Sequence, residues 1–139
     1  MYKRAVRRAA PRGDVTAYLS ALFAAALDGD ADRLALYCRR MLAGDEVLYN
    51  LTRYPLGDTV VGTVLTNSAL GERLAGRGMR LVRTDVGDRN ISEVMSVLGA
   101  KLGGEPSGHF IIGGGSGDGV LSAAAVAALA ASGGLHTLN

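Results

Sequence analysis

Three aspartates alternate with small residues in the segment DGDADR, residues 28 to 33. Because Gly29 and Ala31 separate Asp28, Asp30 and Asp32, a turned or extended backbone can direct several carboxylate oxygens toward one point. Magnesium is usually held by a few carboxylates together with water and phosphate oxygens. Without a cation, three neighbouring carboxylates repel one another. The spacing therefore favours a magnesium site, and a solvated acidic turn is the alternative reading.

Other metal and nucleophile motifs are excluded by spacing and count. An EF-hand loop needs Gly at its sixth position and Glu at its twelfth, and these positions hold Arg33 and Arg39. One cysteine and two histidines make a poor zinc site. No Ser, His and Asp combination forms a nucleophile set.

A second polar segment, GGEPSGH, occupies residues 103 to 109. Glu105 offers an acceptor, Ser107 a donor and His109 either role, while the glycines let a ligand approach the backbone. Such a set suits sugar hydroxyls, and a plain polar turn is the alternative. The run GGGSGDG, residues 113 to 119, lacks both the dinucleotide fingerprint and a phosphate-loop lysine, so we interpret it as a flexible turn before a helix cap.

Length and composition indicate one globular domain. The chain has 139 residues, of which 48% are hydrophobic and 20% charged. No apolar run is long enough to cross a bilayer, so we expect no membrane partner. The single cysteine, Cys38, permits no internal disulfide and fits a reducing compartment such as the cytoplasm.

The charge is unevenly distributed. Five of the 15 basic residues precede Gly13, which leaves 10 basic against 13 acidic residues in the remainder. We expect residues 1–21 to be a basic, poorly ordered or atypical segment and residues 22–139 to form the domain. A targeting or nucleic-acid-binding arm is the alternative, but no aromatic or groove-reading pattern accompanies it, so no nucleic acid partner is expected.

Alternating apolar strands and helices predict an α/β fold. Strands are expected at 23–27 and 34–37 on either side of the acidic segment, and at 60–65, 79–84 and 109–112. Helices are expected to begin at Gly44 and Asp45, to cover 68–77 and 91–98, and to follow Asp118 as far as Gly133 and Gly134. Asn90 and Glu93 resemble a capping arrangement for the helix at 91–98.

Taken in order, several motifs resemble the third domain of the α-D-phosphohexomutases over residues 24 to 131. They are DGDADR, the GD at 44 and 45, VVGTVLTNSALGERLAGRGMRLVRTDVGDR, GGEPSGHFII and SGDGVLSA. VGDR, residues 86 to 89, is similar to the bacterial phosphoglucosamine mutase branch, although Asn90 replaces the aromatic residue common there. The resemblance implies a three-layer α/β/α domain with a mixed sheet.

The resemblance also implies roles for the polar residues. Asp28, Asp30 and Asp32 would bind Mg²⁺, and Arg33 would lie beside the phosphoryl group being transferred. Glu105 and Ser107 would hydrogen-bond the sugar hydroxyls, and His109 would line the same pocket. The substrate would be a hexose phosphate, with glucosamine phosphate favoured.

Enzymes of this family move phosphate between the 6- and 1-hydroxyls of a hexose through a phosphoserine and a bisphosphorylated intermediate. No serine here resembles that phosphoserine loop, and the family's phosphate-clamping loop is also missing. We therefore expect a metal- and sugar-binding domain that is incomplete for catalysis alone, and supply of the missing domains in trans is one way to complete it. The alternatives are a non-catalytic binding or interaction module and a gene fragment that retains the fold.

Overall fold

The computed structural model describes residues 23–38 and 40–138. The predicted basic segment, residues 1–21, lies outside the described residues. Within them the longest helix has 15 residues, and no helix has both the length and the apolar character that a membrane crossing requires.

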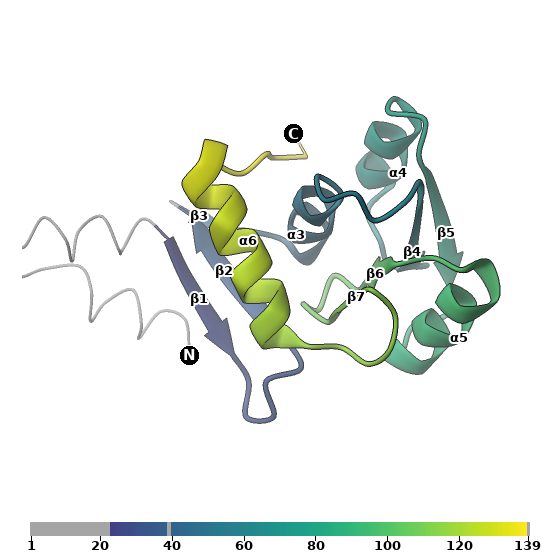
Figure 1. Ribbon diagram of the computed structural model, residues 1–139, viewed down its shortest axis with the longest axis horizontal. Helices are drawn as coiled ribbons and strands as arrows, with labels where there is room; N and C mark the ends of the chain where they lie inside the picture. Colours follow the sequence, from purple (N-terminus) through teal and green to yellow (C-terminus); the bar gives the residue numbers. More distant parts are fainter. Residues whose placement is uncertain (1–22, 39, 139) are drawn as a thin grey trace, which may run out of the picture.

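A four-stranded mixed sheet forms the centre of the domain (Figure 1). Its strands are β4 (Thr59–Thr63), β5 (Arg80–Thr84), β6 (Leu102–Gly104) and β7 (Phe110–Ile112), in the order β5-β4-β6-β7. β5 and β6 run parallel to β4, and β7 runs antiparallel to β6. All five residues of β4 are buried, as the apolar character of its centre indicates, but the strand ends at Thr63 rather than at the predicted residue 65, and Val64 and Leu65 are exposed.

Helices cover both faces of this sheet, which confirms the three-layer α/β/α prediction. The helices are α3 (Gly44–Leu51), α4 (Ser68–Ala75) and α5 (Asp88–Leu98). Val61 packs with Ile91 of α5 in one cluster, whereas Val60 belongs to the larger core cluster with Leu48 of α3 and Leu70 of α4. Because adjacent strand residues point to opposite faces, α5 lies on one face and α3 and α4 lie on the other.

A smaller antiparallel sheet carries the acidic segment. Its strands are β1 (Phe23–Leu27), β2 (Leu34–Cys38) and β3 (Arg40–Met41), in the order β1-β2-β3. Helix α6 (Gly119–Gly133) packs against β1, β2 and β7 and joins this sheet to the rest of the domain (Figure 1). The strand predicted at 23–27 is confirmed. A run as apolar as FAAAL favours a buried strand, but here Ala25 is exposed and Leu27 half-buried.

The helix ends agree with the predicted caps at one helix and differ at another. The N–H of Leu121 donates to Asp118 Oδ1 at 2.9 Å, which confirms the cap of α6. The Asn90 cap was wrong: α5 begins at Asp88 after Gly87, and Asn90 Nδ2 instead donates to the carbonyl of Val86. A side chain inside the first turn can bond backward to the preceding loop, and sequence spacing does not separate that case from a true N-cap.

Candidate functional site

The hairpin between β1 and β2 brings the three aspartates together. One carboxylate oxygen of each of Asp28, Asp30 and Asp32 lies within 4.8 Å of the others. The N–H of Arg33 donates to Asp28 Oδ1 at 3.1 Å, and Ala31 adopts a left-handed φ of 59°. We call residues 28–33 the acidic loop. Backbone bonds and the Asp28 carboxylate together close the turn, and the three carboxylates converge on one side of it.

Electrostatics distinguish the aspartates from one another. The N–H of Arg33 is the main cause that lowers the pKa of Asp28. Partial burial, followed by the neighbouring carboxylates of Asp30 and Asp28, raises the pKa of Asp32. A cation placed among these carboxylates would lower the pKa of Asp32 again, because an opposite charge favours the ionised form.

The acidic loop is joined directly to the segment 105–109. Arg33 pairs with His109 as an antiparallel bridge, and the N–H of Leu34 donates to the carbonyl of Gly108 at 2.8 Å. His109 Nδ1 lies 3.6 Å from Asp32 Oδ2, and the His109 side chain is only 6% exposed. The side chain of Arg33 is exposed beside this junction. Two segments that lie far apart in sequence therefore form one surface.

Glu105 connects this junction to the VGDR segment. Its side chain is buried, and its Oε1 accepts the N–H of Gly87 at 2.9 Å. The N–H of Gly108 returns to the carbonyl of Glu105 at 3.0 Å, so residues 105–108 form a closed turn. Ser107 is exposed at the tip of that turn. One oxygen of Glu105 is thus already bonded within the protein.

His109 lies between two carboxylates and a shallow depression. Its Nε2 is 4.0 Å from Asp88 Oδ2 and has no hydrogen-bond partner among the described residues. The depression has a volume of about 310 Å³ and is lined by Asp88, Arg89, Ser92, Glu93, His109, Ile111, Gly115, Ser116 and Gly117. The imidazole thus forms part of the wall of the depression, with Nε2 itself buried.

The glycine-rich run 113–119 forms another wall of the site, a role that sequence reasoning missed. A Cβ placed on Gly117 would lie 2.3 Å from His109 Nε2, so the imidazole rests directly on this backbone. The N–H of Gly119 donates to the carbonyl of Ala31 at 2.9 Å. Close backbone approach, rather than flexibility, explains these two glycines. The sequence shows many glycines in this run, but it does not show that Gly117 contacts His109 or that Gly119 contacts Ala31.

Residues 40–139 match the family described as phosphoglucomutase/phosphomannomutase, alpha/beta/alpha domain III. The chain belongs to this family. The matched residues include the 105–109 segment, VGDR and the glycine-rich run, while the acidic loop precedes them.

Curated relatives of this domain III chain are phosphoglucosamine mutases. The protein from Variovorax paradoxus is 48% identical over 93 residues, which are 62% of this chain and 21% of the relative. The protein from Gluconacetobacter diazotrophicus is 42% identical over 114 residues, or 75% of this chain and 25% of the relative. The chain thus spans about a quarter of the length of these relatives.

Solved structures of the family share the fold. A protein from Thermus thermophilus, solved as a candidate phosphomannomutase, superposes with a TM-score of 0.72 at 28% identity over 81% of this chain and 28% of its own. A phosphoglucomutase/phosphomannomutase family protein from Burkholderia thailandensis gives 0.65 at 26% identity, over 74% of this chain and 24% of its own. The α/β/α domain described above is therefore the domain III fold of phosphohexomutases.

Proposed function

We propose that this chain supplies the magnesium-binding and sugar-binding side of a phosphohexomutase site that interconverts glucosamine 6-phosphate and glucosamine 1-phosphate. The observation that carries the proposal is the junction of the acidic loop with residues 105–109. The bridge between Arg33 and His109 brings a cluster of three carboxylates against a turn that holds Glu105 and Ser107. A phosphate bound near the cation would then have its sugar over that turn.

The acidic loop suits one magnesium ion. Oxygens that share an octahedral magnesium lie about 3 to 4 Å apart, since each is about 2.1 Å from the ion. The three carboxylate oxygens here lie within 4.8 Å of one another, so small side-chain rotations bring them to that spacing. Bound at Asp28, Asp30 and Asp32, the ion would neutralise charge on the transferred phosphoryl group.

The remaining residues have distinct proposed roles. Arg33 adds a fixed positive charge beside the phosphoryl group. Ser107 donates a hydrogen bond to a sugar hydroxyl or accepts one from it, and the second carboxylate oxygen of Glu105 accepts one. The N–H of Gly87 holds the first oxygen of Glu105 in place. His109 lines the pocket with its imidazole, whose Nε2 is buried against the backbone of Gly117.

We further propose that the phosphoserine of the reaction comes from outside residues 23–138, in a longer polypeptide or in a second chain. An exposed apolar turn supports this idea. The N–H of Thr66 donates to the carbonyl of Thr63, and the central residues Val64 and Leu65 are 60% and 67% exposed. Large apolar side chains are unusual at the centre of a solvated turn, and they favour packing against another protein surface.

Calorimetric titration of the purified chain tests the proposed function. Wild type is expected to bind Mg²⁺ and, in its presence, glucosamine 6-phosphate. Asp30→Asn should weaken Mg²⁺ binding, and Glu105→Ala should weaken sugar phosphate binding without removing Mg²⁺ binding. Glu72→Gln, an exposed carboxylate on α4, is the matched control and should bind both as wild type does. A folded wild-type chain that binds neither ligand would favour the non-catalytic module instead.

A further inference from the structure

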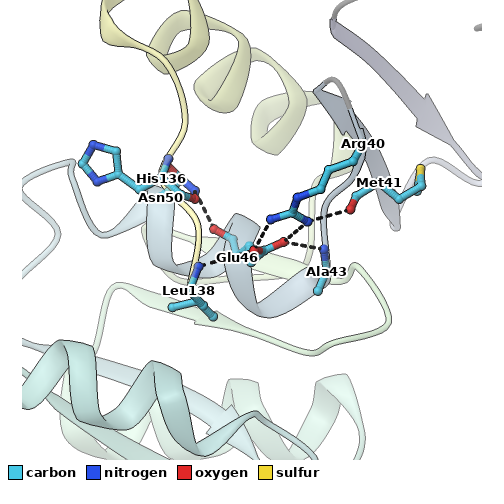
Figure 2. Close-up of polar contacts among 7 residues, drawn as sticks. All are labelled: Arg40, Met41, Ala43, Glu46, Asn50, His136 and Leu138. Carbon is cyan, nitrogen blue, oxygen red and sulfur yellow. Dashed lines mark hydrogen bonds and ion pairs between the residues drawn. The ribbon is translucent and has the colours of Figure 1, made fainter.

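The segment 134–138, which we call the strap, runs back along α3 after the end of α6 (Figure 2). Side chains on one face of α3 and of the turn after it hold backbone atoms at every second residue of the strap. The bonds are Arg53 Nη1 to Gly134 O (2.6 Å), Asn50 Nδ2 to His136 O (2.8 Å), His136 N to Asn50 Oδ1 (2.8 Å) and Leu138 N to Glu46 Oε1 (3.4 Å).

The spacing of these bonds fits an extended chain lying against a helix. Glu46 and Asn50 lie one turn apart on one face of α3, about 6 Å along the axis, and Arg53 follows in the turn after the helix. Two residues of extended chain advance about 6.6 Å, which is close to that spacing. All four bonds go to strap backbone atoms, and the side chain of Leu138 is buried in the larger core cluster. The strap is therefore anchored by both its backbone and one apolar side chain.

Glu46 is the point at which the strap meets the start of α3. Its carboxylate accepts two bonds from the Arg40 guanidinium, at 2.6 and 2.9 Å, and one from the N–H of Ala43 at 3.1 Å (Figure 2). The same carboxylate accepts the N–H of Leu138. Undocking the strap would remove one of these partners and open the core beneath Leu138, so the first turn of α3 would lose support.

The first turn of α3 also supports residues 105–108. A Cβ placed on Gly44 would lie 2.4 Å from the carbonyl oxygen of Pro106 and 2.8 Å from that of Glu105. The two backbones are in direct contact, with no side chain between them to absorb a movement. A displacement at Gly44 must therefore displace Glu105 and Pro106.

We infer that the strap is a positioning element for the turn 105–108, acting through Glu46 and Gly44. The docked strap fixes the first turn of α3, and that turn fixes the backbone beneath Glu105. When the strap is released, the first turn of α3 and the backbone beneath Glu105 are both free to move. The inference rests on the proposed function only for the identity of the ligand, because the coupling of the strap to residues 105–108 exists without any ligand.

Two substitutions at His136 test the coupling in the full chain. His136 is exposed, and its ring centroid lies 6.4 Å from that of Tyr49. His136→Ala removes this ring contact and keeps the N–H that Asn50 accepts, whereas His136→Pro removes both, so the pair isolates the N–H. We expect His136→Pro to speed amide hydrogen exchange at Leu138 at least tenfold and to shift the amide resonances of Glu105, Ser107 and Gly108. His136→Ala should leave both unchanged.

Leu138→Ala provides a second route to release if His136→Pro does not fold, and the same changes are expected. Faster exchange at Leu138 with unshifted amides at 105, 107 and 108 would overturn the coupling. Unchanged exchange at Leu138 in both variants would overturn the docking of the strap by these groups.

Ligand binding separates this inference from the proposed function. Where wild type binds glucosamine 6-phosphate, His136→Pro should weaken the affinity at least threefold relative to His136→Ala, and equal affinities would contradict a positioning role. If wild type does not bind the sugar phosphate at all, the proposed function fails, and the ligand-free amide shifts still decide the coupling.

Discussion

Gly44→Ala perturbs the contact between α3 and the turn 105–108 with the smallest possible change. The new methyl group would begin 2.4 Å from Pro106 O, 2.7 Å from Pro106 C and 2.8 Å from Glu105 O, all of them backbone atoms. Ordinary contacts of this kind start at 3.4 Å, so the two backbones must separate by about 1 Å.

The size of the effect follows from that displacement. Overpacking of a close contact costs about 1 to 3 kcal/mol, and the better helix propensity of alanine over glycine returns up to about 1 kcal/mol. We therefore expect the free energy of unfolding to fall by about 1 to 2 kcal/mol. Because a shift of about 1 Å at a site can reduce productive binding strongly, sugar phosphate affinity should fall as well.

Urea unfolding and amide spectra measure both consequences. The matched control is Gly76→Ala at the end of α4, where the added Cβ would lie 3.6 Å from its nearest neighbour and the backbone is right-handed helical. That control should be neutral or stabilising by up to about 1 kcal/mol. Unchanged stability and unshifted resonances at 105–108 in Gly44→Ala would show that the first turn of α3 does not press on this turn.

The remaining predictions concern the cation, acid stability and the glycine-rich run. Mg²⁺ should raise the melting temperature of the wild type, and Asp30→Asn should remove most of that rise; an equal rise in both proteins would contradict the metal site. The bond from Arg40 lowers the pKa of Glu46 below its ordinary 4.5, so this carboxylate stabilises the fold above pH 4.5 and the stabilisation is lost as the pH falls through its lowered value. Glu46→Gln should accordingly show a flatter loss of stability over that range in acid unfolding curves, and an identical slope would count against the pairing. Gly117→Ala should displace the His109 ring and shift its imidazole resonances, whereas an unmoved ring would mean that this backbone is not its support.

Local signals in the sequence predicted the main elements. The continuous apolar run at Val60 identified a strand that is buried on both faces, and Asp118 marked the start of the last helix. The strands on either side of the acidic loop followed from apolar runs interrupted by three aspartates. Each of these features depends on residues close together in the chain, which is why sequence patterns report them.

Elements that depend on distant partners were not predicted. Strand β6 has only three residues, of which Gly103 and Gly104 show no side-chain pattern, and it exists because it pairs with β4 and β7. The two-residue strand β3 was missed for the same reason. The strap likewise depends on α3, whose contacts with it span more than 80 positions of sequence.

The sequence predicted the separate loops of the candidate site but not the contacts that join them. The carboxylates and the Glu105 to His109 segment were identified from their residue types, and the structure adds their junction through Arg33 and His109. The bond from Gly87 to Glu105 and the packing of Gly117 on His109 could not be read from spacing, because both join loops from different strand ends.

The most direct test of the central claim is a nuclear magnetic resonance titration of the chain, first with Mg²⁺ and then with glucosamine 6-phosphate. We expect saturable amide shifts at residues 28–33 on adding Mg²⁺, followed by shifts at the amides between 103 and 109 on adding the sugar phosphate. A folded chain with no shifts in either segment would contradict a metal- and sugar-binding site in this domain.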